Sequence, residues 1–378
     1  MKTSTAIGLM SGSSLDGLDI ATVKFTMGSP NHIGFELLHH AAIEYPTEWQ
    51  KKLSEAFYAD AKTLKQLDLE YGQYLGEATA RYIADTGCKP DLIASHGHTI
   101  FHRPEEGYTL QIGNGQAIAN RCKTTVVNDF RSEDVSKGGQ GAPLVPIGDR
   151  LLFGDYEVCL NIGGIANASY EKDGQRIAFD ICIANQALNH LAQREGKKYD
   201  ADGDMARQGK VVGELLNKLN DNAFYGKPAP KSLGREFFEA NIRQLIETYP
   251  TADALCTFAE HIAMQVGQAT NAIPSGRMLI TGGGAYNKHL IGRIKAHSRH
   301  EIVIPDPDII DFKEAIVFAL LGFLRLEGIT NVLKSVTGAS EDSCSGEIAC
   351  APQSDEQQSA ETQIATNHYL CTSKTIDR

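Results

Sequence analysis

Asp180 is the side chain that we expect to carry out chemistry. It follows a short apolar stretch, Ile177–Phe179, which is typical of a buried strand. Folds that alternate strands and helices place reactive groups in the loops at strand ends. A carboxylate there can act as a general base when it lies within hydrogen-bond distance of a water molecule. The alternative is a structural role, in which Asp180 caps a helix that begins near Asn185.

Three glycine-rich segments are the second chemical feature of the chain. The first, Gly8–Asp19, combines glycines and serines with the carboxylates Asp16 and Asp19, and the others are Asn161–Asn167 and Gly282–Gly284. Glycine leaves backbone N–H groups free to face an anion and lets a phosphate approach closely. Asp16 would then hold the Mg²⁺ that accompanies such a phosphate. The alternative is that each segment is an ordinary tight turn.

Three histidines, His96, His98 and His102, have a spacing that a metal site could use. On a strand, His96 and His98 would share one face. However, Gly97 lies between them and an Arg-Pro pair follows His102. These residues favour a loop that lines a ligand site or forms hydrogen bonds over a zinc site.

Hydrophobic periodicity predicts the elements that must position these residues. In the first part of the chain we expect strands at 5–10, 19–25, 34–39, 91–95 and 124–129, and helices at 47–57, 61–86 and 116–121. Thr47 is the expected cap of the first helix, and Gly87 ends the second. In the second part we expect strands at 157–161, 166–170, 176–180 and 278–281, and helices at 185–194, 204–220, 234–247, 251–271 and 311–326.

This order of elements predicts the fold class. Two successive units of three strands followed by alternating helices and strands fit a duplicated, ribonuclease-H-like α/β architecture. The boundary is expected near Ser136–Pro146, where glycine and proline concentrate. We therefore expect one domain at 1–136 and a second at 137–340. Residues 341–378 are rich in Ser, Gln, Glu and Thr, so we expect a disordered polar tail.

The composition is that of an acidic globular protein. The chain has 378 residues and a formal net charge of −11, which argues against a nucleic-acid partner. No apolar run approaches the roughly 20 residues of a membrane span. The N-terminal apolar run is broken at Ser11–Ser14, so we expect no signal peptide. The eight cysteines form no C-x-x-C pair, which favours free thiols in a reducing cytoplasm over zinc sites.

Short ordered blocks recur far beyond Gly8–Asp19. They lie at 95–104, 110–115, 129–131, 138–146, 161–167, 199–203, 230–236, 282–285 and 313–319. Together these blocks resemble the anhydro-N-acetylmuramic acid kinases, a family of the actin/Hsp70/sugar-kinase superfamily. The resemblance runs from about residue 5 to about residue 348.

The resemblance implies two ribonuclease-H-like domains of the actin/Hsp70/sugar-kinase type, with an interdomain nucleotide cleft. It implies an ATP- and Mg²⁺-dependent kinase in which Asp180 activates a water that attacks the anomeric carbon of a 1,6-anhydro amino sugar. The released O6 would take the γ-phosphoryl group of ATP. The product would be N-acetylmuramate 6-phosphate, formed in the cytoplasm during cell-wall recycling.

The resemblance also implies roles for further residues. The expected nucleotide contacts are Gly12, Ser13, Ser14, Leu15, Asp16, Gly17, Asp19, Asn161, Gly163, Gly164, Gly282, Gly283 and Gly284. The expected sugar contacts are His96, Gly97, Asn114, Arg131 and Asn185. Arg131 could bind the sugar carboxylate bidentately, or it could form a salt bridge at the domain boundary, as could Lys137.

Glu314 is the second catalytic candidate. The resemblance suggests that it faces the sugar, but an acid early in the closing helix is also favoured by the helix dipole. Lys313, beside it, is expected at the surface.

The chain departs from the family pattern directly after Asp180. The usual Thr-Gly-Pro-Gly-Asn is replaced by Ile181-Cys182-Ile183-Ala184-Asn185, and the loss of two glycines stiffens the expected loop. A related amino-sugar kinase with altered specificity is therefore one alternative. The others are a nucleotide-switched binding protein, disfavoured because no separate peptide-binding domain is seen, and a metal-dependent nuclease, disfavoured by the acidic charge. The expected partner is a small amino sugar, with a homodimer as a candidate assembly.

Overall fold

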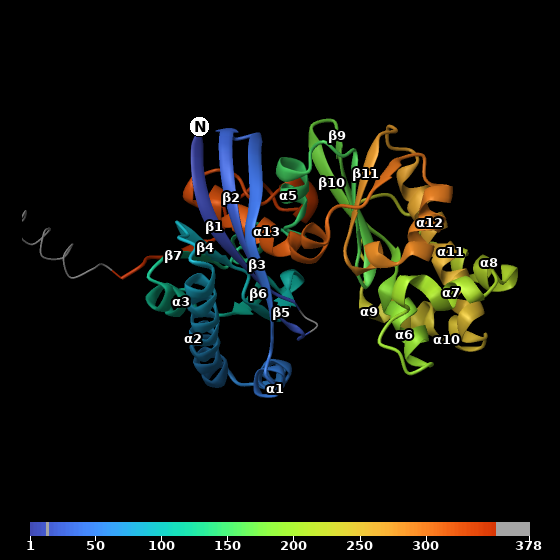
Figure 1. Cartoon of the computed structure of the whole chain (residues 1–378), viewed down its shortest axis with the longest axis horizontal. Helices are drawn as coiled ribbons and strands as arrows, with labels where there is room; N and C mark the ends of the chain where they lie inside the picture. Colours follow the sequence, from blue (N-terminus) through green and yellow to red (C-terminus); the bar gives the residue numbers. More distant parts are fainter. Residues whose placement is uncertain (13–14, 353–378) are drawn as a thin grey trace, which may run out of the picture.

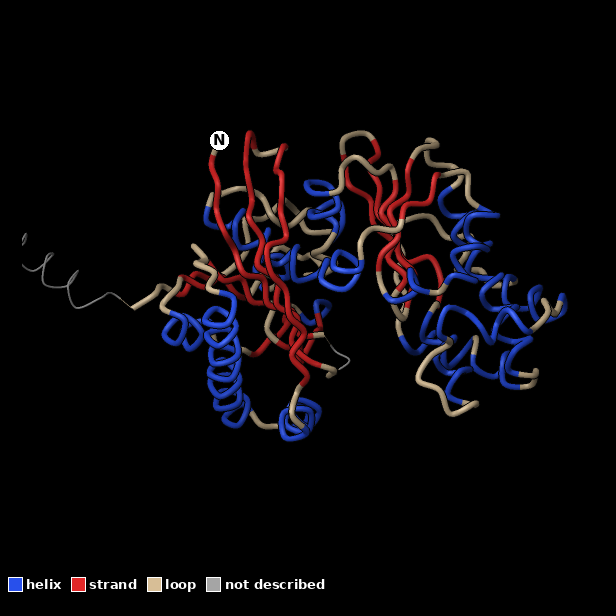
Figure 2. The backbone as a smooth tube through the Cα atoms, viewed as in Figure 1, coloured by secondary structure: helices blue, strands red, loops and turns tan. Residues whose placement is uncertain are grey.

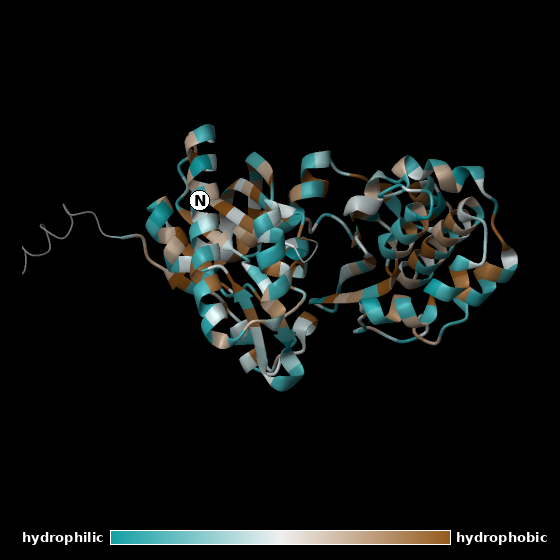
Figure 3. Cartoon of the chain, turned by 90° about the horizontal axis from the view of Figure 1, so that it is seen from below, coloured by the Kyte–Doolittle hydropathy of each residue, from teal (hydrophilic) through white to brown (hydrophobic). Residues whose placement is uncertain are grey.

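Two β-sheets with flanking helices form the two lobes of the computed structural model, which describes residues 1–12 and 15–352. The lobes lie side by side in two perpendicular views (Figures 1 and 3), and helices cover the sheets of both (Figure 2). The strands of the first sheet are β1 (Lys2–Ser11), β2 (Gly17–Ser29), β3 (His32–Glu44), β4 (Leu92–Ser95), β7 (Thr125–Asn128) and β13 (Glu347–Ala349). A separate two-stranded sheet pairs β5 (His98–Arg103) with β6 (Tyr108–Ile112).

The second sheet repeats the topology of the first. Its strands are β8 (Val158–Ile162), β9 (Ile165–Lys172), β10 (Gln175–Ile183), β11 (Arg277–Thr281) and β12 (Glu301–Val303). The order β10-β9-β8-β11-β12 matches β3-β2-β1-β4-β7 of the first lobe. In both sheets the first three strands are antiparallel and the last two run parallel to the first. The predicted duplicated α/β architecture is therefore confirmed.

Strand alternation places a hydrophobic layer on each face of the first sheet. Ile7 packs with α2 (Ala61–Thr86) on one face, and Ala6 packs with α13 (Pro307–Leu326) on the other. The second sheet packs one face against α11 (Thr251–Thr270). Ala178 of β10, however, packs with the first-lobe core, so the opposite face of the second sheet looks towards the first lobe.

The remaining helices follow the expected ranges with local breaks. In the first lobe they are α1 (Thr47–Glu55), α3 (Gly115–Cys122) and α4 (Ser132–Ser136), and α5 (Pro146–Leu152) connects the lobes. In the second lobe they are α6 (Asn185–Gln193), α7 (Asp204–Gln208), α8 (Gly213–Asn220), α9 (Arg235–Asn241), α10 (Arg243–Glu247) and α12 (Lys288–His297). The single helices predicted at 204–220 and 234–247 are thus each two shorter helices.

Two predicted helix starts were wrong. Pro46, not Thr47, precedes α1 as its N-cap residue, and no side chain caps that end. Helix α13 begins at Pro307, after Asp306, so Asp311 does not cap it. Proline fits the first turn of a helix because the N–H that it lacks would have no helical partner there.

The C-terminal part of the described chain returns to the first lobe. Strand β13 pairs with β7, and α14 (Lys334–Thr337) belongs to the core around α13. Ser343 and Ser345 are buried. Residues 341–352 therefore differ from the expected polar tail, because the side chain of Asn331 hydrogen-bonds the main chain of Ser345 and fixes this segment. Residues 353–378 of that predicted tail lie outside the described residues, and the domain bounds stay a prediction.

Two further observations concern the described residues alone. Seven cysteines in this part of the chain have free thiols. None of its helices combines the length and the apolar character that a membrane crossing needs.

Candidate active site

A row of polar residues crosses the second sheet at the position of Asp180. Asp180 of β10 pairs with Asn167 of β9, Asn167 pairs with Asn161 of β8, and Asn161 pairs with Thr281 of β11. Directly opposed residues of neighbouring strands share a face of the sheet. Asp180 also alternates with Ala178, which packs against the first-lobe core. The row, which we call the polar row, therefore lies on the face that looks towards the first lobe.

Asp180 is held by a segment that the sequence did not single out for this purpose. Its N–H donates to the carbonyl of Lys231 at 2.9 Å, and its Oδ2 accepts from the N–H of Leu233 at 2.7 Å. Burial raises the pKa of Asp180, and the Leu233 hydrogen bond opposes this rise. The site thus orients one carboxylate oxygen and makes the group a stronger base than an exposed aspartate.

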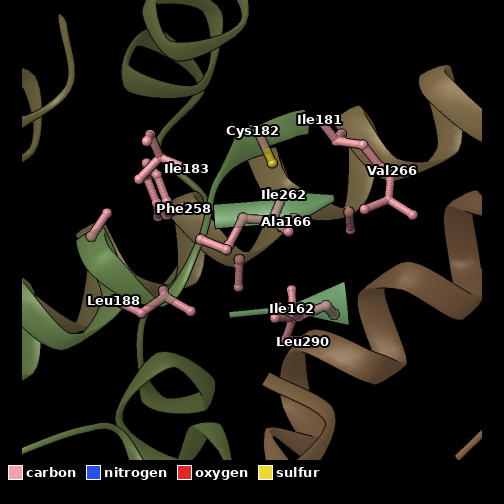
Figure 4. Close-up of a cluster of buried hydrophobic side chains, with 14 of the residues drawn as sticks. Ile162, Ala166, Ile181, Cys182, Ile183, Leu188, Phe258, Ile262, Val266 and Leu290 are labelled. Atoms are coloured by element: carbon pink, nitrogen blue, oxygen red, sulfur yellow. The ribbon is translucent and has the colours of Figure 1, made fainter. Parts of the chain in front are cut away.

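The prediction that Asp180 ends its strand was wrong. β10 continues to Ile183, and a register irregularity falls between Asp180 and Cys182. Ile181, Cys182 and Ile183 are buried in the core of the second lobe (Figure 4). The residues that depart from the family pattern are therefore part of the strand, which suits the two β-branched residues among them. Asp180 does not cap α6, which has no side-chain cap hydrogen bond.

The hairpin between β8 and β9 offers open space at both of its glycines. A Cβ built on Gly163 would meet no atom closer than 3.5 Å, and one on Gly164 none closer than 3.9 Å. Their carbonyls accept hydrogen bonds from the first N–H groups of α6, including that of Asn185. Asn185 also donates from its side chain to the carbonyl of Ile162 at 3.0 Å. Hydrogen bonds from the start of α6 hold the hairpin on one side, and its open side can accommodate a ligand.

The third glycine-rich segment follows β11 and lies against this hairpin. A Cβ on Gly282 or Gly284 would collide with Asn161 or Ile162, so these two glycines permit close packing of the two turns. Gly283 is open, since the nearest atom to its Cβ position is the Asn185 side-chain nitrogen at 3.7 Å. A short 3₁₀ helix, η4 (Gly283–Tyr286), separates this turn from α12. Two of the three predicted segments therefore adjoin at one end of the second sheet.

The first glycine-rich segment forms the β1–β2 hairpin. Asp19 pairs with Met10 on the opposite strand, Leu15 has a positive φ of 59°, and Asp16 is exposed. Burial and the charges of Glu314, Asp311 and Asp16 raise the pKa of Asp19 to about 6. Gly12 precedes the turn, and Gly17 packs against the main chain of Ile43. Ser13 and Ser14 lie outside the described residues.

Glu314 lies about two turns into α13, not in its first turn. Solvent still reaches its side chain, but the surrounding protein raises its pKa by desolvation, which the charges of Arg131 and Lys313 oppose. Glu314 and Asp19 therefore form an acidic group on the first-lobe side. The prediction that Lys313 lies at the surface was wrong, because it is buried against Asp149.

The guanidinium group of Arg131 forms hydrogen bonds with neighbours in the first lobe. Its Nη2 lies 2.9 Å from Nε2 of His96, and its Nη1 donates to the carbonyl of Gly141 at 2.7 Å. His96 is buried beside Phe318 of α13. Burial and the Arg131 charge lower the pKa of His96 to about 3, so it is neutral at physiological pH. Arg131 thus bridges His96 and the interlobe connection, and its charge faces Glu314.

Other predicted sugar contacts have structural tasks. Asn114 caps α3 by accepting from the N–H of Ala117 at 3.0 Å, and its side-chain nitrogen donates to Asp68. Gly97 has a φ of 71°, and a Cβ there would lie 2.5 Å from the carbonyl oxygen of Ile112. Asn114 also lines a cavity of about 910 Å³ between α1 and α2. That cavity contains none of the other predicted site residues.

Within the described part of the chain, the expected metal ligand Asp16 is not part of a preformed ion site. Among the residues described here, no group of three or more His, Cys, Asp or Glu side chains is arranged to hold a metal. The three histidines diverge as well: His98 pairs with Ser11 at 3.0 Å, while His102 pairs with Thr109 at 3.1 Å. A divalent ion at Asp16 would therefore need further ligands from a phosphate group and water, which is usual for Mg²⁺.

Sequence reasoning missed Asn167, Thr281 and Leu233 as site residues. Asn167 lies within a motif that was recognised, and its spacing from Asn161 on a hairpin could have indicated that the two face each other. Leu233 acts through its backbone N–H, for which the side chain gives no signal. Thr281 has a buried hydroxyl without a partner among the described residues, aligned with Asn161 on the next strand.

Known proteins match this chain over most of its length. The family model described as anhydro-N-acetylmuramic acid kinase matches residues 4–351. An anhydro-N-acetylmuramic acid kinase of Aliivibrio fischeri is 36% identical over 372 residues, covering 90% of this chain and 98% of the relative. One of Gloeobacter violaceus is also 36% identical, over 369 residues, covering 90% of this chain and 97% of the relative.

Solved structures resemble the chain more remotely. A dehydratase activator of Clostridium difficile with bound ADPNP is 14% identical, with a TM-score of 0.42, over 86% of this chain and 96% of that one. A glucokinase of Streptomyces griseus in complex with glucose and AMPPNP is 11% identical, with a TM-score of 0.40, over 84% of this chain and 99% of that one. The assignment of the fold rests on the repeated sheet topology.

Proposed function

The chain belongs to the anhydro-N-acetylmuramic acid kinase family, and we propose that its reaction takes place between the polar row of the second sheet and the Asp19–Glu314 group of the first lobe. In this reaction a kinase opens 1,6-anhydro-N-acetylmuramic acid with water and phosphorylates the released O6. The products are N-acetylmuramate 6-phosphate and ADP, as required in cell-wall recycling.

The β8–β9 hairpin fits the phosphates of ATP. The open sides of Gly163 and Gly164 leave room for oxyanions where a side chain would intrude. Gly283 adds a third open position beside them. The hairpin belongs to the same end of the sheet as Asp180, because Asn161 and Asn167 flank its turn and share the polar row with that carboxylate. This arrangement supports a nucleotide site and a general base on the same side of the sheet.

Asp180 is the proposed general base. Oδ2 is oriented by Leu233, which leaves Oδ1 available to a water molecule. When that water attacks the anomeric carbon, Asp180 takes its proton and the bond from this carbon to the bridging oxygen breaks. The bridging oxygen becomes O6, which accepts the γ-phosphoryl group as ADP leaves. Desolvation raises the pKa of Asp180 and so strengthens it as a base.

Asp16 and Asp19 are the carboxylates that fit Mg²⁺ next to the β1–β2 hairpin. Burial, and after it the charges of Glu314, Asp311 and Asp16, raise the pKa of Asp19, so a cation there would relieve the repulsion between these carboxylates. Bound Mg²⁺ would neutralise charge on the phosphates. Glu314 is the proposed sugar contact of the first lobe, because solvent reaches it while the residues that flank it are buried.

The cytoplasm is the proposed location. Free thiols at the seven described cysteines support it, since reducing compartments keep thiols unpaired. The homodimer stays a prediction, which light scattering of the purified protein can test.

The alignment of Asp180 with the open phosphate hairpin is the observation that carries the proposal. We expect Asp180→Asn to reduce turnover of the anhydro sugar at least 10³-fold while ADP affinity, measured by calorimetry, changes less than about threefold. Asp204→Asn is the control, because Asp204 is an exposed carboxylate on α7. Reaction in ¹⁸O-water should place one labelled oxygen on the anomeric carbon. Phosphorylation without ring opening, or full turnover by Asp180→Asn, would contradict the proposal.

A further inference from the structure

A buried network of charged and polar side chains joins the two lobes. Lys313 of α13 forms an ion pair with Asp149 of α5, with Nζ 2.6 Å from Oδ1. The other Asp149 oxygen accepts from the hydroxyl of Ser169 at 2.5 Å. That hydroxyl accepts in turn from Nη2 of Arg176 at 2.8 Å. We call these four residues the interlobe network.

The interlobe network lies next to the polar row. Ser169 precedes Lys172 on β9 and pairs with Ala178 of β10, whereas Asn167 pairs with Asp180. The Ser169–Ala178 pair is thus two residues, or about 7 Å, along each strand from the Asn167–Asp180 pair of the polar row. Arg176, like Asp180, stands on the face of β10 that looks towards the first lobe, because the two are four residues apart. The network therefore contacts the same sheet face as the polar row.

Two residues of the network lie on the same elements as the catalytic candidates Asp180 and Glu314. Lys313 directly precedes Glu314 on α13, and Arg176 lies on the strand that carries Asp180. Asp149 connects them from α5, which is packed against α13: a Cβ on Gly148 would lie 2.4 Å from a methyl group of Val317. The carbonyl of Arg176 also accepts from the hydroxyl of Ser335 at 2.8 Å, a further contact with the α14 segment.

Burial makes this arrangement unusual for charged groups. The side chains of Lys313 and Asp149 are each 7% exposed, and that of Arg176 is 1% exposed. Burial acts to lower the pKa of Lys313, but the Asp149 charge and other neighbours outweigh it, so the pKa is raised and the lysine stays charged. Buried ion pairs stabilise proteins little compared with apolar side chains of the same shape, because both ions lose their hydration. Their directional geometry is what an apolar cluster would lack.

We propose that Lys313, Asp149, Ser169 and Arg176 are positioning residues, which hold the helix of Glu314 and the strand of Asp180 in the relative orientation that turnover requires. The proposal rests on the proposed function, since it takes Asp180 as the general base and Glu314 as the sugar contact. It goes beyond that function because none of the four residues is among the proposed nucleotide or sugar contacts. The network acts on turnover through two other side chains.

Ser169→Ala is the first test, because it removes one hydroxyl and leaves the ion pair of Lys313 and Asp149 intact. The second is the double variant Lys313→Met with Asp149→Leu, which removes both members of this ion pair together. Arg176 loses its contact with Asp149 in this variant, but Glu171 remains 3.8 Å from its Nη1 as an ionic partner. We expect both variants to bind ADP within threefold of the wild type and to keep their KM for ATP. We expect kcat to fall about 10-fold in the first and 10- to 100-fold in the second, because small displacements of reacting groups cost this much.

Arg293→Met is the matched control. Arg293 pairs with Glu260 between α12 and α11, wholly within the second lobe. It should lower the melting temperature without changing kcat. If the network has only a structural role, kcat should depend on stability alone. The double variant would then have wild-type kcat at temperatures where it is fully folded.

Several outcomes would overturn the inference. These are a wild-type kcat in Ser169→Ala, a wild-type kcat in a stably folded double variant, or a parallel loss of kcat and ADP affinity in either. If the double variant does not fold, Ser169→Ala alone decides. Product analysis of the wild type is run in the same series. Absence of the ring-opened, phosphorylated sugar there refutes the proposed function, whereas correct product together with unaffected variants refutes only the positioning role.

Discussion

Gly8 is the residue whose substitution tests most directly how α13 sits on the first sheet. It lies in β1, on the face that packs against α13, where the helix approaches the strand backbone to backbone. A Cβ on Gly8 would lie 1.8 Å from the carbonyl oxygen of Ala315 and 2.8 Å from the N–H nitrogen of Ala319. Both atoms belong to the helix main chain, so no side chain can rotate away. We therefore expect Gly8→Ala to displace the helix itself.

The size of the effect follows from this geometry. A carbon atom needs at least 3.0 Å here, so α13 and β1 must separate by about 1.2 Å. β1 cannot yield, because it is hydrogen-bonded to β2 on one side and β4 on the other. Overpacking of this kind costs about 3 kcal/mol of unfolding free energy. Glu314, which precedes Ala315, would move with the helix, and a shift of about 1 Å at the proposed sugar contact can cost about 10²-fold in kcat.

Urea unfolding and steady-state kinetics of Gly8→Ala check both numbers. Gly292→Ala is the control, because Gly292 lies inside α12 with no atom within 4 Å of its Cβ position. There alanine should stabilise the protein by about 0.5–1 kcal/mol, as a better helix former, and leave kcat unchanged. An unfolding free energy for Gly8→Ala within 0.5 kcal/mol of the wild type, with unchanged kcat, would refute the argument about the helix–strand contact.

Three further predictions concern the site. Burial raises the pKa of Asp180 above its ordinary 3.8, so the proposed base is protonated as pH falls through this raised value. We therefore expect kcat/KM to decline on an acid limb above pH 3.8, and a limb at or below 3.8 contradicts the proposed role. The pKa of Asp19, raised to about 6, means that its contribution to stability is complete below pH 3.8 and is lost as pH rises through about 6. Asp19→Asn should therefore stabilise the protein at pH 8 by about 1–2 kcal/mol after allowance for solvent screening, and not at pH 3.5, as urea unfolding at both pH values will show. Gly164→Ala should fold with wild-type stability, because its Cβ meets nothing within 3.9 Å, yet raise the KM for ATP about 10-fold; an unchanged KM would remove this turn from the nucleotide site.

Much of the fold could be predicted because its signals are local. The bounds of α2, 61–86, were predicted correctly, since Gly87 adopts the left-handed conformation that ends a helix. The three-strand units were visible as alternating apolar stretches, and their repetition indicated the duplicated topology. The glycine turns around Gly164 and Gly283 were recognised for the same reason, as short runs of consecutive residues.

The features that were missed depend on contacts between distant parts of the chain. Nothing near Lys313 reveals that Asp149 lies against it, so a lysine in a helix was expected at the surface. The extension of β10 beyond Asp180 is stabilised by burial of Ile181 in the second-lobe core. Comparison with a family pattern that has glycines there favoured a loop instead. The backbone N–H of Leu233, which orients Asp180, has no sequence signature at all.

The position of Glu314 follows from how its two neighbours are used. Successive residues of an α-helix are rotated by about 100° around the axis. Ala315 faces β1, at the contact with Gly8, and Lys313 points towards α5 and Asp149. Glu314 lies about 100° from both directions, so it can pack into neither of these interfaces. This explains why solvent reaches it while Lys313 and Ala315 are buried. The backbone contact at Gly8 fixes the distance between α13 and the first sheet. The ion pair of Lys313 with Asp149, which in turn accepts a hydrogen bond from Ser169, fixes the rotation of α13 relative to the second sheet. Glu314 is thereby directed outwards by constraints from both lobes, which is what a side chain needs if it is to face a substrate bound between them.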